Sequence, residues 1–230
     1  TQGASGGPVS ILNADLIRQV KFYTGAFPVD KGNALSSVMD ITLREGNPDK
    51  QRFKATLGAS EAAFSGSGHF DSKATYIFSV RQSYLQLLFK LLGLPFLPNY
   101  IDAQAKIRIR PSERYEITFL GLMGIDRLRL NLDDKEGENE YILSYIPKIE
   151  QETFTLGATL KHFGGEHIQT FSVGYSFLAN RNKKYIDNDE SNEENLRLRL
   201  RSTEGRATVR FENRTLLGRW RLREGAEVSL

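Results

Sequence analysis

The chain has 230 residues, no cysteine and a formal net charge of +3 at pH 7. The missing cysteine excludes a disulfide framework and cysteine-ligated metal sites, and the small, mixed charge is weak evidence for a polyanionic partner. No apolar run approaches the roughly 20 residues that a membrane helix needs. The longest, residues 85–97, is interrupted by Gln86, Lys90, Gly93 and Pro95.

The first 46 residues are predicted to form a small α+β segment. Asn13 can cap a short helix over residues 14–17, and short strands are predicted at residues 20–23 and 38–43. A loop rich in glycine and proline, residues 25–33, separates the two strands. Gly46-Asn47-Pro48-Asp49 then marks a boundary. We therefore expect residues 1–46 and 47–230 to be separate domains.

Residues 47–230 are dominated by a period of two. In residues 101–110, for example, apolar side chains alternate with polar ones, which places them on opposite faces of a strand. Many such segments without helical stretches between them predict an all-β antiparallel meander of about eight to ten strands. The other segments with this pattern are residues 53–59, 64–70, 74–81, 115–123, 154–161, 171–177, 196–201 and 207–219.

The connections between these strands alternate in length. Tight turns are predicted at residues 71–72, 111–114, 164–166 and 203–205, and long connections at residues 82–100, 125–140 and 180–195. Strict alternation gathers the long loops at one end, as in transmembrane β-barrels. About nine residues per strand, tilted by about 40°, rise about 23 Å, which suits the apolar band of such a barrel.

One helix is predicted inside the first long connection. Leucines at positions 85, 88, 91 and 92 recur at helical spacing, and Gly93 with Pro95 ends the run.

Particular stretches resemble a known family. Residues 11–28, with Gly32 and residues 35–41, resemble the C-terminal part of the plug of a TonB-dependent outer-membrane receptor. Residues 79–92 and 100–106 are similar to the first barrel strands, notably in receptors with a carboxypeptidase-like N-terminal domain. The resemblance covers roughly residues 7–125. The plug motif residues are Gly25, Phe27, Pro28, Gly32, Ser36 and Ser37.

The resemblance implies a bacterial outer-membrane receptor for TonB-energised uptake of a solute. The chain would hold the end of the plug and the first barrel strands, because plugged barrels have about 22 strands. TonB would engage an N-terminal plug segment that the chain lacks, and membrane lipid would surround the barrel. The solute could be a siderophore, a cobalamin, a glycan or a peptide. In isolation, unpaired strand edges would favour self-association.

Ligand contacts are expected on the external loops. The candidate residues are Tyr84, Tyr100, Arg127 and Tyr185.

A second reading is a soluble β-rich module that contacts polyanions through arginines. On the receptor reading these arginines line a polar lumen, while Leu196, Leu198 and Leu200 face lipid. A nucleic-acid surface would interleave exposed aromatic residues, and few lie near, so no nucleic-acid partner is expected. The arginines concerned are Arg197, Arg199, Arg201, Arg206, Arg210, Arg214, Arg219, Arg221 and Arg223.

No catalytic, cofactor or metal site is predicted. His162 and His167 flank a predicted turn, where their side chains would splay apart. Ser65-Gly66-Ser67-Gly68 is followed by strand residues rather than by the helix that a phosphate loop needs. The acidic residues 133–140 and 187–194 are read as solvated loops. We therefore expect a protein that is not an enzyme.

Overall fold

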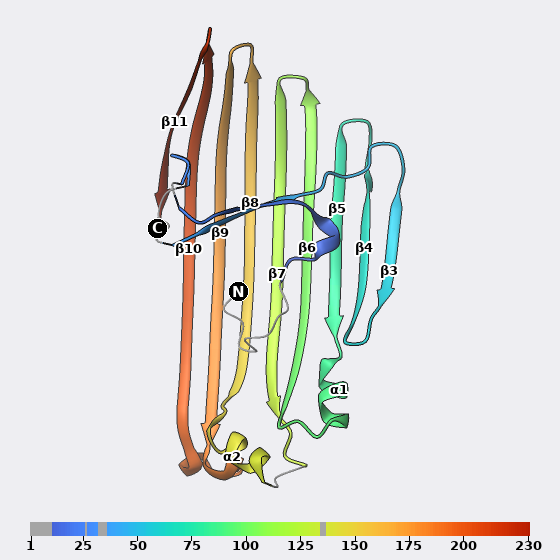
Figure 1. Ribbon diagram of the computed structural model, residues 1–230, viewed down its shortest axis with the longest axis vertical. Coiled ribbons are helices and arrows are strands. Elements are labelled where there is room, and N and C mark those ends of the chain that lie inside the picture. The colour runs from blue at the N-terminus through green and yellow to red at the C-terminus, as the bar shows by residue number, and fades with distance from the viewer. Residues whose placement is uncertain (1–10, 26, 32–35, 134–136) are drawn as a thin grey trace.

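A computed structural model describes the chain except for residues 1–10, 26, 32–35 and 134–136. A two-stranded antiparallel sheet, β1–β2, lies across a nine-stranded antiparallel sheet in which β3 to β11 are neighbours in sequence order (Figure 1). The strands are β1 (Ile17–Tyr23), β2 (Val38–Leu43), β3 (Arg52–Leu57), β4 (Glu61–His69), β5 (Ala74–Ser83), β6 (Phe96–Ser112), β7 (Tyr115–Leu130), β8 (Lys148–Gly164), β9 (His167–Tyr185), β10 (Leu196–Leu217) and β11 (Trp220–Ser229).

The expected antiparallel meander is confirmed. In this chain the large sheet is open, since β3 and β11 each pair with one neighbour only among the described strands.

Five short helices complete the described structure. They are η1 (Ala14–Leu16), α1 (Leu85–Leu91), α2 (Glu138–Tyr145), η2 (Ile186–Asn188) and η3 (Glu193–Asn195). The predicted cap is present, because Asn13 Oδ1 accepts a hydrogen bond of 2.9 Å from the backbone of Asp15. The predicted helix after Tyr84 is α1. No helix in the described ranges combines the length and the apolar character needed to span a membrane.

The long connections lie at one end of the sheet. The connections that carry α1, α2 and η2–η3 gather at the bottom in Figure 1, and we call this end the loop rim. The hairpin turns that join β4–β5, β6–β7, β8–β9 and β10–β11 lie at the other end, the turn rim. The predicted sorting of long loops to a single end is therefore confirmed.

Two details of the predicted connections are wrong. The predicted turn at residues 203–205 lies inside β10, and the chain instead turns at Gly218, which has φ of +57°. The predicted loops 125–140 and 180–195 are shorter, because β7 and β9 continue to Leu130 and Tyr185.

The turns step along the sheet. One row of hydrogen-bonded partners crosses four hairpins, and its two partners in each hairpin are 8, 12, 15 and 19 positions apart. Each successive hairpin turn therefore lies about two residues further along the strands. With a rise of about 3.3 Å per residue and a spacing of about 4.8 Å between strands, the line of turns slopes by about 30° relative to the row of partners. This is near the strand tilt of closed barrels, about 35–45°. The row is Gly68, Tyr76, Ile107, Phe119, Ala158, Val173, Val209 and Val228.

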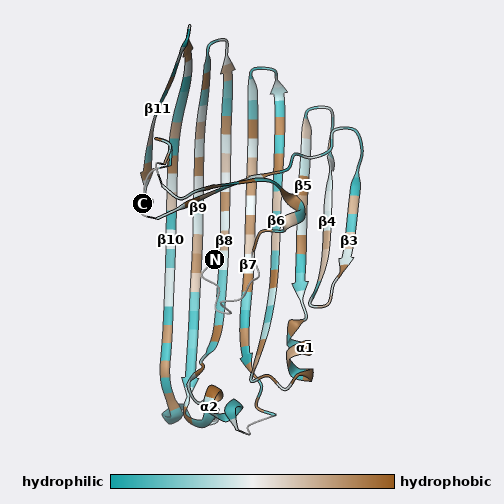
Figure 2. Cartoon of the chain, viewed as in Figure 1, coloured by the Kyte–Doolittle hydropathy of each residue, from teal (hydrophilic) through white to brown (hydrophobic). Residues whose placement is uncertain are grey.

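The two faces of the large sheet differ in polarity. We call the face crossed by residues 11–46 the inner face and the opposite one the outer face. Polar and apolar residues alternate along the strands (Figure 2). The inner face carries, among others, Thr75, Ser79, Gln104, Arg108, Thr118, Thr155, Thr159, Ser172, Ser176, Arg206 and Arg210. The outer face carries Phe53, Phe64, Phe78, Val80, Ile107, Phe119, Met123, Phe154, Leu156, Leu160, Phe171, Val173, Val209 and Phe211.

Candidate functional site

The segment of residues 11–46 contacts the inner face at two separate places. The first contact is apolar and lies over β5 and β7. Leu16 and Leu43, from the two ends of the segment, pack with Ile77 of β5, whose side chain is 2% exposed. Leu120 of β7 packs against the same cluster. Because aliphatic side chains exclude water here, burial holds this part of the segment on the sheet. We call this cluster the apolar contact.

Polar bonds surround the apolar contact. Asn13 Nδ2 donates a hydrogen bond of 2.8 Å to Ser79 Oγ, so the residue that caps η1 also ties it to β5. Lys54 of β3 pairs with Asp15 at 2.6 Å. Glu45 pairs with Lys106 of β6 at 2.7 Å. These side chains position the segment against β3, β5 and β6.

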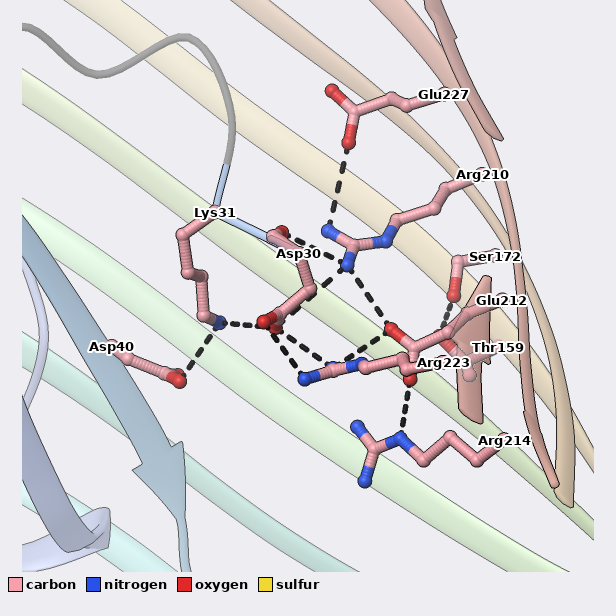
Figure 3. A network of polar contacts seen from close by, with 10 residues as sticks. All are labelled: Asp30, Lys31, Asp40, Thr159, Ser172, Arg210, Glu212, Arg214, Arg223 and Glu227. Carbon is pink, nitrogen blue, oxygen red and sulfur yellow. Dashed lines mark hydrogen bonds and ion pairs between the residues drawn. The ribbon is translucent and has the colours of Figure 1, made fainter. Parts of the chain in front are cut away.

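The second contact is ionic and lies over β10 and β11 (Figure 3). Asp30, from the loop between β1 and β2, has a side chain that is 8% exposed. Its Oδ1 lies 2.7 Å from Arg223 Nη1, and its Oδ2 accepts a hydrogen bond of 2.8 Å from Arg223 Nη2. Arg210 Nη2 donates a hydrogen bond of 3.0 Å to the backbone oxygen of Asp30. Arg210 of β10 and Arg223 of β11 thus both bind Asp30 of the loop. We call this group the ionic contact.

Glu212 organises the arginines of the ionic contact. Its Oε2 lies 2.9 Å from Arg223 Nη2 and 3.1 Å from Arg210 Nη2, while Oε1 accepts from Arg214 Nε. The Arg–carboxylate pairs are charge-assisted hydrogen bonds, the stronger class. Two buried carboxylates thus face three guanidinium groups, Glu227 lies 3.6 Å from Arg210 as a third acid, and Glu212 holds the arginines in place for Asp30.

Lys31 links the ionic contact back to β2. Its Nζ lies 2.8 Å from Asp40 and 3.7 Å from Asp30. The hydrogen bond from Lys31 lowers the pKa of Asp40 below its ordinary value. Lys31 thereby links the loop between β1 and β2 to strand β2 itself.

A third polar cluster lies on the inner face nearer the loop rim. Arg81 of β5 pairs with Asp102 of β6 at 2.9 Å, and both are buried. Tyr100 donates a hydrogen bond of 2.5 Å to Glu61 of β4, and Arg81 lies 4.0 Å from the same carboxylate. Tyr100 is buried as well, and the cluster lies on the inner face between the apolar contact and the loop rim.

The four predicted ligand-contacting residues do not come together. Tyr84 begins α1 and donates to the backbone oxygen of Gly58. Tyr100 lies in the inner-face cluster. Arg127 lies exposed on the outer face, and Tyr185 is buried at the end of β9. Their contact with a ligand stays a prediction.

The plug motif residues lie at the turns of the segment. Gly25 follows β1 in a bend, and the Pro28 oxygen accepts a hydrogen bond of 2.8 Å from Lys31. Ser36 and Ser37 are exposed just before β2. Phe27 is half-buried, and Gly32 lies outside the described residues. Sequence reasoning missed Asp30, although it stands within the quoted loop, because nothing local marks a buried acid.

The predicted phase of the arginines is wrong in part of β10. Arg199 and Arg201 are an even number of residues from Val209 in an unbroken register, so they lie on the outer face. Leu198 and Leu200 lie on the inner face instead of facing outward. On the inner face, Arg210, Arg214 and Arg223 pair with acids as the lumen reading expects. Arg206 and Arg221 share that face, and no described carboxylate lies within 4.0 Å of either.

The histidines near the β8–β9 turn have separate partners. His162 stacks on Tyr115 and bonds Gln169, whereas His167 bonds Thr215. Among the described residues, no group of three or more histidine or acidic side chains is placed to hold a metal ion.

The architecture is similar to that of a TonB-dependent receptor. A doubly substituted variant of the ferric enterobactin receptor from Pseudomonas aeruginosa matches 97% of this chain with a TM-score of 0.70 at 13% sequence identity. The match covers 37% of that receptor, so this chain spans well under half of its length. No protein-family profile and no curated protein matches the sequence. The likeness shows the fold alone: the antiparallel sheet of this chain, which is open, resembles part of the architecture of that receptor.

Proposed function

We propose that the chain is part of a TonB-dependent receptor of the bacterial outer membrane, which takes up a solute. Residues up to 46 are the C-terminal part of its plug, and residues 47–230 are barrel strands. The carrying observation is the opposite polarity of the two faces: the inner face is polar and holds residues 11–46, and the outer face is apolar. A soluble sheet of this size would bury its apolar face under another layer, and the described residues form none.

The height of the apolar band supports a membrane setting. On the outer face of β8, the apolar residues Phe154 to Leu160 are bounded by Glu152 and His162. The six steps of the apolar stretch extend about 20 Å and the ten steps between its polar limits about 33 Å, which is about 17–29 Å along the barrel axis at the slope of about 30°. Outer-membrane barrels have an apolar band of about 25 Å.

The inner face suits a path for a polar solute. The cluster of Arg81, Asp102, Glu61 and Tyr100 lies between the apolar contact and the loop rim, which in such barrels faces outward. Charged and hydroxyl groups there can hydrogen-bond a solute that passes the plug. TonB, acting on the N-terminal part of the plug, would supply the energy. The similar receptor is named for ferric enterobactin, and a ferric siderophore is one candidate cargo.

The soluble polyanion-binding alternative has less support. Its arginine face is divided between the two sides of β10, and Arg210 and Arg214 on the inner face are paired with acids. Among the described residues, the buried apolar cluster is the small one beneath the segment.

Single cysteines test the proposal, since the chain has none of its own. Leu156→Cys on the outer face and Thr155→Cys on the inner face of β8 are a matched pair. In outer membranes of cells that express the full receptor, a spin label at 156 should be relaxed by oxygen dissolved in lipid. A label at 155 should respond to a water-soluble nickel chelate. A chain absent from the outer membrane, or labels with reversed access, would overturn the proposal.

A further inference from the structure

The first two long connections are joined at the loop rim by side chains that donate to backbone oxygens. Asn131 Nδ2, just after β7, donates a hydrogen bond of 3.0 Å to the oxygen of Leu94, which follows α1. Asn139 Nδ2 of α2 donates a hydrogen bond of 2.9 Å to the oxygen of Gly93. The connection that carries α1 is therefore bound twice by the connection that carries α2.

Lys184 joins α2 to the third long connection. Its Nζ donates to the backbone oxygen of Leu143, in the last turn of α2, and donates a hydrogen bond of 2.7 Å to Asn188 Oδ1. Asn188 Nδ2 donates a hydrogen bond of 3.1 Å to the same oxygen of Leu143. One carbonyl of α2 thus receives side chains from β9 and from η2. We call the described parts of residues 84–95, 131–147 and 186–195 together the cap.

Lys184 is a buried cation that is bound by uncharged oxygens. The residue is 8% exposed, and within the described ranges no carboxylate lies within 4.0 Å of its ammonium group. Burial of an ammonium group without an anion is costly, so packing alone does not favour a lysine here. The carbonyls at the C-terminal end of a helix carry partial negative charge, which offsets part of this cost. Lys184 is therefore suited to hold the end of α2.

The register places the bond from Lys184 on the inner side of the sheet. Lys184 lies an even number of residues from Ser176 in an unbroken register, so both side chains point to the inner face. The end of α2 that Lys184 binds consequently lies on that side as well. Leu143 is 3% exposed, and Leu128 and Leu130, on the inner face of β7 near the loop rim, are also buried. The cap therefore reaches over the inner face.

The backbone of η2 turns sharply next to Lys184. Asp187 and Asn188 have φ of +51° and +59°, in the left-handed region. Asparagine and aspartate adopt this region more readily than other residues with a side chain. The turn brings the Asn188 amide back to Lys184 directly after β9 ends.

We infer that the cap is one pre-assembled unit, pinned to the inner face by Lys184, and that its three connections open together rather than one at a time. Lys184 is a positioning residue in this role, because it acts through α2. The consequence for transport rests on the proposed function. A solute that enters from the loop rim on this side of the barrel would meet a single gate instead of three separate loops.

Hydrogen exchange of the purified full-length receptor tests whether the cap is one unit. Lys184→Met keeps the aliphatic stem and removes the ammonium group. Lys183→Met is the matched control, since Lys183 is exposed on the outer face. We expect Lys184→Met to reduce the protection of α2, of η2 and of residues 91–94 by a similar factor, about tenfold, because a hydrogen bond from a charged donor is lost. Lys183→Met should leave this protection unchanged.

Two results would overturn the inference: equal protection in the two lysine variants, or a loss confined to η2. Asn188→Gly keeps the test decisive if Lys184→Met does not fold. Glycine adopts the left-handed backbone without strain and removes the amide that binds Leu143. It should reduce protection in the same three places by about threefold, because Lys184 still binds Leu143. Unchanged protection of α2 in Asn188→Gly would then count against the inference.

Cysteine labelling in whole cells tests the gate, since the chain has no cysteine of its own. Asn182→Cys places a thiol on the inner face, two residues from Lys184. In cells that express the full receptor, a membrane-impermeant sulfonated maleimide should label this thiol at least about fivefold faster when Lys184→Met is added. Lys183→Met should not change the rate.

Equal labelling rates in the two backgrounds would overturn the gate and leave the proposed function standing. Absence of the receptor from the outer membrane would overturn the proposed function. Hydrogen exchange of the purified protein would still decide in that case whether the cap opens as one unit.

Discussion

The two contacts that hold residues 11–46 on the sheet use different physics. The apolar contact buries aliphatic side chains around Ile77, and the ionic contact surrounds Asp30 with Arg210 and Arg223. Salt does not screen hydrophobic burial, whereas ion pairs weaken as salt screens them. A segment fixed by one contact of each kind can therefore loosen at one end while the other stays attached.

The largest effect should come from the apolar contact. Replacing Ile77 by Ala removes a fully buried side chain and leaves a cavity, which should lower the opening free energy of the segment by about 2–5 kcal/mol. Hydrogen exchange of β1 and β2 amides in the purified full receptor measures this free energy. Ile107→Ala is the control, since it removes the same atoms from the outer face. Equal protection in both variants would show that Ile77 does not hold the segment.

The ionic contact should be the next most sensitive. Asp30→Asn leaves two arginines short of an anion and should cost about 1–3 kcal/mol of segment protection, because those guanidinium groups are partly exposed. The loss should shrink at high salt. Asp15→Asn is the matched control, whose pair with Lys54 is about half exposed and should contribute less than about 1 kcal/mol. If the two variants behaved alike, the ionic contact would be no stronger than a surface pair.

Asn13 contributes to the apolar side of this comparison in two ways, because it caps η1 and hydrogen-bonds to β5. Asn13→Ala should reduce protection of the start of β1 by about 1 kcal/mol, through loss of the cap and of the hydrogen bond to Ser79. Ser79→Ala keeps the cap but removes the hydroxyl that accepts from Asn13 Nδ2. Hydrogen exchange of the Ser79→Ala variant should fall between that of Asn13→Ala and that of the unchanged protein. Full protection in Ser79→Ala would assign the whole effect to the cap.

The smallest effect should be a pH dependence within the segment. The folded pKa of Asp40 is lowered from 3.8 by the bond from Lys31, so its contribution to stability is present above pH 3.8 and is lost as pH falls through the folded value. In this pH range, the exchange of β2 amides should accelerate after correction for the pH dependence of the intrinsic exchange rate. Asp40→Asn should remove this change. If exchange in Asp40→Asn accelerated over the same pH range, the pH dependence would come from another group.

The strand pattern, the side of the long loops and the helix after Tyr84 could be predicted, because each depends on local periodicity and turn chemistry. The false turn at residues 203–205 shows the limit. Gly205 lies within β10, where a Cβ would stand 2.8 Å from Tyr175 Oη. Glycine leaves room there for Tyr175 of the neighbouring strand β9, and this contact cannot be seen in the local sequence.

The prediction of which residues of β10 lie on each face was wrong for a related reason. Alternation shows that a strand has two faces, but it does not show how far along the strand the apolar band extends. Leu198 and Leu200 lie beyond the band, where the inner face becomes apolar and the outer face basic. Likewise the partners of Asp30 are about 180 residues away in sequence, and pairs that distant leave no local signal.

The position of the segment limits how the sheet can close. A ring made of these nine strands alone, at a tilt of about 30°, would have a backbone diameter of about 17 Å, a width that inward side chains fill by themselves. The β1–β2 hairpin could not then occupy its interior. In the proposed barrel, the free edges of β3 and β11 would therefore need further strands between them, and the completed circumference would have to be wide enough to admit a folded insert.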